Sequence, residues 1–405
     1  MLKQIEGSRA VAEAVGLCRP KVICAYPITP QTHIVEGLGE MVRMEELVDC
    51  EFINVESEFA AMSVAIGSSA TGVRTYTATS SQGLLYMTEA VYNASGMGLP
   101  IVMTLGTRAI GAPINIWNDH SDAMAIRDAG WIMLFAQSNQ EAIDLHIQAF
   151  RIAETLGAPV MVCVDGFILT HAYERLDIPE QAQVDAFVGQ FMPAYELDPK
   201  HPVTIGALVG PEAYSEVRYL AHRKQLEALE LVPQVAVEFE AMFARDSGGL
   251  VHTFATEGAK TIVVAMGSVI GTILDVVEEL QQDGHPIGTM AIACYRPFPV
   301  EAVRDALLHA ERVIIIEKSI TPGMGGPLTA DVRLALHDTP INIVSVVAGL
   351  GGRAIMKDSL RALLLRAQHD EQPDITFLDL NWDMISSPLN DLESRANYKR
   401  LGTAS

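Results

Sequence analysis

The sequence has few cysteines, and none of them are spaced for a metal cluster. Its 405 residues contain five, at positions 18, 24, 50, 163 and 294, and no two stand in a CxxC spacing. Structural zinc sites and iron–sulfur clusters need closely spaced cysteines, and a disulfide framework needs an even number in a short secreted chain. None of these is therefore expected, and most of the cysteines are predicted to be small core residues.

Positive charge and long apolar runs are also scarce. Lysine and arginine number 28 against 50 aspartates and glutamates, so the formal net charge is −22. Such a surface repels nucleic acid and anionic membranes, and neither is expected as a partner. Apolar runs such as residues 101–103 end within a few positions, and the first residues lack the order of a signal peptide. We expect a cytoplasmic protein.

Apolar runs alternate with helix-patterned stretches along most of the chain, which predicts an α/β fold with largely parallel sheets. The length allows two or three domains. Strands are expected in the first half at residues 21–26, 51–55, 73–78, 101–106 and 160–165. In the second half they are expected at 261–267, 287–294, 312–317 and 341–347, with helices near 270–282, 300–310, 325–337 and 355–366. The second set is typical of a compact doubly wound unit.

Changes in this pattern predict the domain limits. Residues 211–244 suggest a helix broken at Pro233, and the stretch DSGG at 246–249 looks like a linker. We therefore expect a first domain over 1–245 with connecting helices, a second over 246–368, and a C-terminal tail over 369–405. The tail shows no periodicity and is expected to cover a neighbouring surface or to be partly disordered.

Thr29 stands between two prolines in the stretch AYPITPQT, directly after an apolar run. The residue before a proline avoids the helical region and proline suits the first helical position, so Thr29 is a candidate N-cap of a helix beginning at Pro30. Ligands of α/β proteins bind at the carboxyl ends of strands, and a helix N-terminus with a spare hydroxyl suits a carboxylate or phosphate. Capping and ligand contact are both open.

Glu58 is expected in the first turn of a helix whose next residues, Phe59 to Met62, are almost wholly apolar. A glutamate near a helix N-terminus is favourable in itself because of the helix dipole. Facing an apolar cleft, however, its carboxyl group would be desolvated and could share a proton with a ligand nitrogen. Glu56 lies off that face and is expected to be solvated.

Two more segments with candidate residues follow predicted strands. Ser81 and Gln82 precede Gly83 between a strand and an apolar helix, where backbone amides could approach a flat or charged ligand. Arg108 lies just beyond the strand expected at 101–106, and its guanidinium fork suits a carboxylate. A simple surface arginine is the alternative.

Two further motifs allow a binding role but favour a structural one. Asp119, His120 and Asp122 could suggest a metal, yet their spacing matches no metal motif, so turn and helix-cap roles are favoured. The stretch EKSITPGMGGPL at 317–328 lacks the full GxGxxG order of a dinucleotide site. We interpret it as a tight turn from strand to helix that touches another subunit.

Several long motifs, in order, resemble the α subunits of the multi-subunit pyruvate:ferredoxin oxidoreductase family. They are YPITPQT, VESEFAAMS, TATSSQGL, TRAIGAPINIWNDHSD, DGFILTH, VVAMGS, RPFP, EKSITPGMGGPL and GLGGR, and they span most of the chain. The resemblance implies a thiamine-diphosphate-binding fold, its pyrimidine-binding domain first, followed by an α/β domain like the C-terminal domain of transketolase.

The resemblance also implies roles for the candidate residues. Glu58 matches the glutamate that contacts N1′ of the aminopyrimidine of thiamine diphosphate. Thr29 and Arg108 match the residues that hold the substrate carboxylate, and we place Ser81 and Gln82 beside the cofactor. The implied reaction converts pyruvate and CoA into acetyl-CoA and CO2 and reduces ferredoxin, reversibly. Another 2-oxo acid (2-oxoisovalerate, 2-oxoglutarate, oxalate), a transketolase-type transferase and a non-catalytic dinucleotide-binding or scaffold protein are the alternatives.

Partner subunits are implied by what the chain does not contain. It has no GDG motif followed by a distant asparagine, the usual magnesium–diphosphate signature of thiamine enzymes, and no cysteine clusters. The resemblance assigns diphosphate binding, Mg2+ and a [4Fe-4S] cluster to a β subunit, further clusters to a ferredoxin-like δ subunit, and adds a γ subunit. The chain alone is therefore expected to be inactive.

Overall fold

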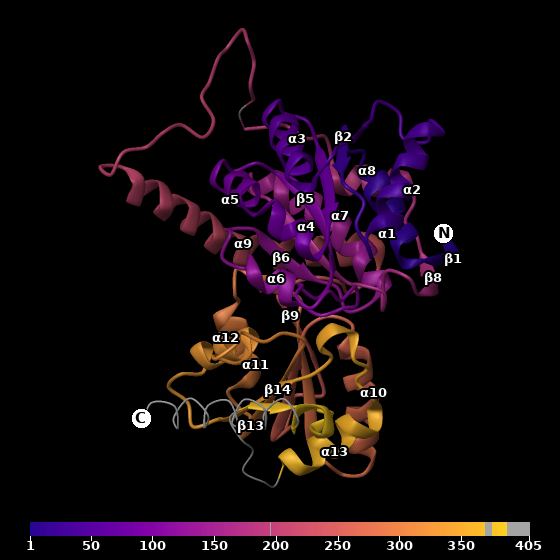
Figure 1. Ribbon diagram of the computed structural model, residues 1–405, viewed down its shortest axis with the longest axis vertical. Coiled ribbons are helices and arrows are strands. Elements are labelled where there is room, and N and C mark those ends of the chain that lie inside the picture. The colour runs from indigo at the N-terminus through magenta and orange to yellow at the C-terminus, as the bar shows by residue number, and fades with distance from the viewer. Residues whose placement is uncertain (195, 369–374, 387–405) are drawn as a thin grey trace, which may run out of the picture.

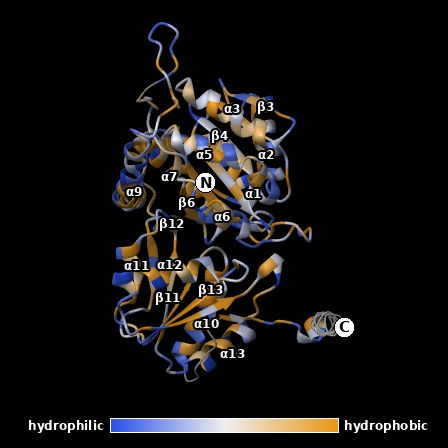
Figure 2. Cartoon of the chain, turned by 60° about the vertical axis from the view of Figure 1, so that its left-hand side comes forward, coloured by the Kyte–Doolittle hydropathy of each residue, from blue (hydrophilic) through white to orange (hydrophobic). Residues whose placement is uncertain are grey.

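The structure is a computed structural model that describes residues 1–194, 196–368 and 375–386. Two lobes lie one above the other along the long axis, each built on a sheet covered by helices (Figure 1). The strands in the middle of both lobes carry mainly hydrophobic residues, as buried parallel strands do (Figure 2). The predicted α/β class is confirmed. Among the described residues, every helix is too short or too polar to span a lipid bilayer.

The first sheet has seven strands in the order β12-β6-β7-β5-β4-β2-β3, and all but β12 run parallel. Their bounds are β2 Val22–Ala25, β3 Glu51–Asn54, β4 Thr75–Thr79, β5 Ile101–Thr107, β6 Ile132–Phe135, β7 Val160–Asp165 and β12 Cys294–Arg296. The core on one face includes residues of α1 Gly7–Leu17, α2 Thr32–Arg43, α7 Asn139–Leu156, α8 Gln181–Val188 and α9 Tyr214–Phe243. The core on the other face includes residues of α3 Glu58–Ala70, α4 Ser81–Tyr86, α5 Thr88–Gly96 and α6 Ser121–Ala125. A separate antiparallel ribbon pairs β1 Leu2–Glu6 with β8 Tyr173–Asp177.

The second sheet has six strands in the order β15-β14-β13-β10-β11-β9, of which only β9 is antiparallel. The strands are β9 Val251–Phe254, β10 Thr261–Ala265, β11 Ile287–Ile292, β13 Arg312–Glu317, β14 Asn342–Val347 and β15 Ile375–Phe377. The helices are α10 Val269–Gln282, α11 Val300–Leu307, α12 Pro327–Ala335 and α13 Lys357–Ala367, with the short η1 Leu350–Gly352. The four helices expected in this half are confirmed.

Two details differ from the sequence predictions. The strand expected over 287–294 ends at Ile292, and the chain then crosses to the first sheet, where β12 pairs antiparallel with β6. The helix expected to break at Pro233 runs on without interruption. Its buried residues, including Val232 and Phe239, pack it along α7, and this packing outweighs the hydrogen bond lost at the proline.

The C-terminal tail is only partly described. Residues 375–377 form β15, which adds a parallel strand to the edge of the second sheet beside β14. This strand was not predicted, because three residues carry no measurable periodicity. Residues 369–374 and 387–405 of the predicted tail lie outside the described residues.

A buried charge cluster joins the two lobes. The Lys318 ammonium, from the segment after β13, lies 2.7 Å from Oδ2 of Asp165 at the end of β7, and donates at 2.9 Å to Oδ1 of Asn118. His120 Nε2 lies 2.8 Å from the other oxygen of Asp165. Burial opposes ionisation of Asp165, but the charges and hydrogen bonds of Lys318 and His120 outweigh it and hold the pKa of that carboxyl well below its usual range.

This cluster predicts a large loss of stability in Lys318→Met. The substitution keeps the length of the side chain but leaves the Asp165 carboxylate, 1% exposed, without its ammonium partner. We expect the free energy of unfolding in denaturant titrations of the chain to fall by about 3–5 kcal/mol. Lys260→Met is the control, because the pair Lys260–Glu311 is mostly exposed and should contribute less than about 1 kcal/mol. Equal losses in the two variants would contradict a stabilising role for the cluster.

Candidate active site

Glu58 is a buried carboxylate, although it belongs to the first turn of a helix. It is the first residue of α3, as predicted, and the preceding Ser57 caps the helix by accepting a hydrogen bond from the Ala60 amide at 3.2 Å. Glu58 is only 8% exposed, and its side chain makes no hydrogen bond with a described residue. Glu56 is exposed, as expected. A buried carboxylate without a partner is costly, so this one is positioned to meet a ligand or another chain.

Gly83 lets α4 approach the Glu58 carboxylate closely. A Cβ at Gly83 would lie 2.6 Å from Oε1 of Glu58 and 2.7 Å from Oγ1 of Thr79, closer than side-chain atoms pack. Because Gly83 has no side chain, the Glu58 carboxylate and the Thr79 hydroxyl can both lie against its backbone. The contact of Gly83 with Glu58 was not predicted, because the two residues lie on different helices and no local pattern connects them.

Two buried hydroxyls at this carboxyl end of β4 have no hydrogen-bond partner among the described residues. They belong to Thr79 and Ser80. Gly106 of β5 lies beside Ser80, since a Cβ there would lie 3.0 Å from the Ser80 oxygen and 3.5 Å from Pro30. A buried carboxylate next to unpaired hydroxyls fits the polar edge of a flat heterocycle such as an aminopyrimidine.

Ser81 holds the start of α4 in place. Its backbone has a positive φ of 47°, a left-handed conformation that non-glycine residues rarely adopt. The Ser81 amide donates to Oδ2 of Asp122 at 2.9 Å, and its hydroxyl donates to the Ala109 carbonyl and to Oε1 of Gln82. Strain of this kind persists where the surrounding structure enforces it, often at ligand sites. Gln82 itself is half-buried and lies against Gly111.

Arg108 and Thr29 are brought together, although 79 positions separate them. The Arg108 guanidinium donates from Nη1 to the Thr29 carbonyl at 2.9 Å and from Nε to the Asn115 carbonyl at 3.0 Å. Arg108 is 8% exposed, so it is not a simple surface arginine. Burial lowers the pKa of its guanidinium, opposed by the nearby charge of Asp122. No hydrogen bond joins Nη2 to a described residue, so that nitrogen is free to meet an anion.

The prediction that Thr29 caps a helix is wrong. Helix α2 begins at Thr32, Gln31 occupies the cap position, and no side chain caps the helix. Residues 29–31 form a turn, in which the Gln31 amide donates to the Ile28 carbonyl at 3.0 Å, and Thr29 is exposed. Contact of its side chain with a ligand stays a prediction.

Asp122 ties the Ser81 and Arg108 segments together. Its Oδ2 accepts from both backbone amides, at 2.9 and 3.0 Å. Burial raises the pKa of its carboxyl to about 8, even though these hydrogen bonds lower it. Asp119 accepts from the Ser121 amide, and His120 contacts Asp165. Asp119 thus has the turn role that was expected, whereas His120 occupies the N-cap position of α6 without a side-chain cap hydrogen bond.

The glycine-rich segment after β13 is followed by helix α12, and a carboxylate of the same chain binds two backbone amides at the start of that helix. The Glu317 carboxylate accepts from the backbone amides of Leu328 at 2.9 Å and Thr329 at 3.3 Å, at the start of α12. Burial raises the pKa of Glu317 to about 7, partly offset by these bonds. A Cβ at Gly326 would lie 1.5 Å from Oε1 of Glu317, so this glycine is required for the turn. The Glu317 carboxylate therefore occupies the helix N-terminus where a dinucleotide phosphate would bind. This supports the interpretation of the segment as a tight turn.

The rim of the site is apolar and exposed. The rings of Phe59 on α3 and Tyr86 on α4 lie 6.4 Å apart, and both are exposed. Ile114 and Trp117, from the loop that follows Arg108, are 82% and 50% exposed. Exposed apolar side chains around a polar centre are typical of a surface that another chain covers.

Comparison with known proteins gives matches along nearly the whole chain. Residues 13–236 match the family model described as pyruvate flavodoxin/ferredoxin oxidoreductase, thiamine diphosphate-binding, and residues 259–360 match pyruvate:ferredoxin oxidoreductase core domain II. Pyruvate synthase subunit PorA of Methanosarcina barkeri is 43% identical over 390 residues, 94% of this chain and 97% of that protein. Ketoisovalerate oxidoreductase subunit VorA of Pyrococcus horikoshii is 36% identical over 364 residues, 89% of this chain and 92% of that protein.

Solved structures share the fold. The 2-oxoglutarate:ferredoxin oxidoreductase from Magnetococcus marinus has a TM-score of 0.68 at 17% identity, and the match covers 90% of this chain and 65% of that longer one. A split-gene transketolase, an inactive β4 tetramer, has a TM-score of 0.54 at 16% identity over 90% of this chain and 98% of that one. The first lobe matches a thiamine-diphosphate-binding family model, and the relatives match over nearly the full length of both chains. The chain therefore belongs to the pyruvate:ferredoxin oxidoreductase family.

Proposed function

We propose that this chain is the α subunit of a pyruvate synthase, a cytoplasmic enzyme that oxidatively decarboxylates pyruvate with CoA and reduces ferredoxin, reversibly. The observation that carries the proposal is the Glu58 carboxylate, which is buried against the backbone of Gly83 and has no hydrogen-bond partner in the described part of the chain. The relatives named as pyruvate synthase subunits support pyruvate as the substrate.

Glu58 would act on the pyrimidine end of thiamine diphosphate. When bound, this cofactor supplies an acidic carbon whose deprotonated form attacks the oxo carbon of the substrate. Glu58 holds and exchanges a proton at N1′ of the pyrimidine ring, a hydrogen bond that low local dielectric strengthens. The unpaired hydroxyls of Thr79 and Ser80, with Gln82 and the Ser81 backbone, line the same edge and orient the ring.

Arg108 and Thr29 would bind the substrate carboxylate. One cation and one neutral hydroxyl suit a monocarboxylate, whereas a dicarboxylate calls for a second cation. Arg108 is held by the Thr29 and Asn115 carbonyls, so its guanidinium is positioned before the substrate arrives.

Partner chains would complete the site. Four of the five cysteines are buried, as predicted, and Cys50 is half-buried. Burial raises the pKa of Cys24 and of Cys294 to about 12 and that of Cys50 to about 11, which disfavours the thiolate that a cluster needs. We assign the [4Fe-4S] clusters, Mg2+ and the diphosphate site to β and δ subunits beside a γ subunit. The exposed apolar rim around Phe59 and Trp117 supports a contact there.

Glu58→Gln should abolish turnover while leaving the complex assembled. The amide keeps the shape of the side chain but cannot exchange a proton with the ring nitrogen. We expect kcat in anaerobic viologen-reduction assays to fall by roughly 10²- to 10⁴-fold. Turnover near the wild-type rate would remove Glu58 from this role.

Gly83→Ala should displace the Glu58 carboxylate while residue 58 itself stays a glutamate. The added methyl group meets Oε1 of Glu58 at 2.6 Å, so the carboxylate must move, although alanine favours the helix. We expect weaker binding of thiamine diphosphate by calorimetry and at least roughly tenfold lower kcat. Gly67→Ala on α3 is the matched control, because nothing lies within 4 Å of its added methyl group. Equal behaviour of the two variants would contradict the Glu58–Gly83 contact as a cofactor site.

Arg108→Ala should act on the substrate and not on the cofactor. Loss of a charged hydrogen bond to the carboxylate is expected to raise KM for pyruvate by roughly 10- to 100-fold, with Kd for thiamine diphosphate little changed. Assays with pyruvate, 2-oxoisovalerate and 2-oxoglutarate would also identify the preferred acid. A selective loss of cofactor affinity would show that Arg108 does not bind the carboxylate.

A further inference from the structure

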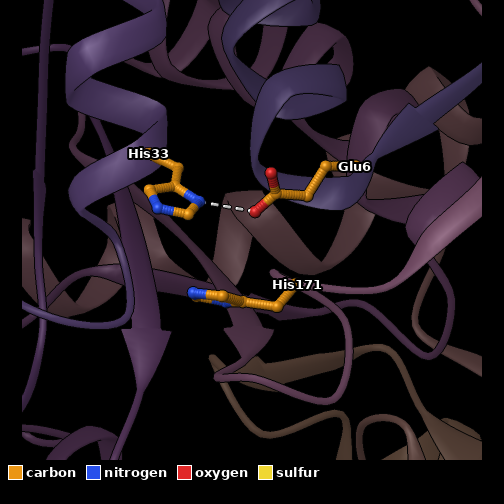
Figure 3. A group of neighbouring side chains, drawn as sticks. All are labelled: Glu6, His33 and His171. Carbon is orange, nitrogen blue, oxygen red and sulfur yellow. Dashed lines mark hydrogen bonds and ion pairs between the residues drawn. The ribbon is translucent and has the colours of Figure 1, made fainter.

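A second polar cluster includes His33, which lies four residues beyond Thr29 of the candidate active site. Glu6 ends β1, His33 is in the first turn of α2, and His171 follows the loop after β7 (Figure 3). One carboxylate oxygen of Glu6 and one ring nitrogen of each histidine all lie within 4.8 Å of one another. The reaction proposed above uses none of these three side chains.

The fold holds the three residues together. The ribbon of β1 and β8 pairs Glu6 with Tyr173, two residues beyond His171. The Gly7 amide donates to the Ala172 carbonyl at 2.9 Å and the Ser8 amide to the Thr170 carbonyl at 2.9 Å, so the segment of His171 is fixed to the start of α1. Helix α2 packs on α1 and brings His33 to the same place.

An ion would replace the contact between His33 and Glu6 and bind a ring nitrogen of His171. His33 Nδ1 lies 2.6 Å from Oε1 of Glu6. Thr170 Oγ1 lies 2.8 Å from Nδ1 of His171, so Nε2 of His171, which has no hydrogen bond to a described residue, is the free donor. Such an outer partner on a ligating histidine is the usual arrangement in metal sites.

We propose that Glu6, His33 and His171 bind one divalent first-row transition-metal ion of the zinc class. Two imidazoles and one carboxylate form a ligand set that such ions prefer over Mg2+ or Ca2+. Tetrahedral ligands about zinc lie roughly 3.4 Å apart. The three atoms, all within 4.8 Å of one another, would reach that spacing once the 2.6 Å contact between His33 and Glu6 opens. His33 is 42% exposed, which leaves a path for the ion and positions for water.

Charge and burial support the site. Glu6 is 7% exposed, so its carboxylate is desolvated and gains from a cation. The cations on the same elements are engaged elsewhere, Lys3 with Glu13 and Arg9 with Glu40.

The ion would stabilise the substrate pocket and take no part in the chemistry. His33 lies four residues beyond Thr29, and the ring of His171 lies 4.6 Å from that of Phe167. Pro30 packs against Gly166, next to Phe167. A bound ion thus ties together the two segments that border the Thr29 loop.

Calorimetric titration of Zn2+ and Co2+ into the separately purified full chain, stripped with a chelator, tests the site without thiamine or partner subunits. We expect one ion per chain, a rise in Tm with ion concentration, and at least roughly tenfold weaker binding in His33→Ala and His171→Ala. His201→Ala is the matched control, because His201 pairs with Asp198 on the surface and should leave binding unchanged.

Zinc-edge X-ray absorption on the wild-type chain provides a test that does not depend on folded variants. A first shell of nitrogen and oxygen alone supports the site. A sulfur shell, no stoichiometric binding, or full binding in both histidine variants would overturn it. Neither measurement depends on turnover. Absence of metal binding would therefore leave the proposed reaction unaffected, and loss of the proposed reaction would leave the metal site unaffected.

Discussion

The structure of the candidate active site depends on the burial of one carboxylate. It belongs to Glu58 at the start of α3 and packs against Gly83 of α4. An acidic side chain in this position would normally be solvated, and here it is 8% exposed without a partner in the described chain. The Thr79 hydroxyl lies against the same Gly83 backbone, and Ser81, with its positive φ of 47°, begins α4 two residues before it.

A second constraint fixes the loops that surround this carboxylate. Asp122 holds the amides of Ser81 and Arg108, and the Lys318–Asp165 pair joins the same region to the second lobe. One hydrophobic cluster also runs from the α3, α4 and α5 face of the first sheet into the second sheet. The second lobe therefore acts as a support for the site, although the candidate ligand-binding side chains come from the first.

Local patterns predicted much of this arrangement. Glu58 in a first helical turn and Arg108 beyond a strand were visible because strand and helix periodicity are local properties. The contacts that create the site are not local: Gly83 meets Glu58, and Lys318 lies 153 positions from Asp165. The same reason explains the transfer of β12 to the first sheet. At Thr29 the proline pattern predicted the wrong helix start, because residues 29–31 form a turn and α2 begins at Thr32.

The central claim is that a buried acid of this chain meets the pyrimidine ring of a cofactor shared with a second polypeptide. A cryo-EM structure of the assembled complex with thiamine diphosphate bound tests it most directly. The account predicts an oxygen of Glu58 at about 2.7 Å from a ring nitrogen, inside a boundary closed to water. A Glu58 side chain that faces bulk solvent, or one neutralised by a lysine or arginine of the partner chain, would contradict it.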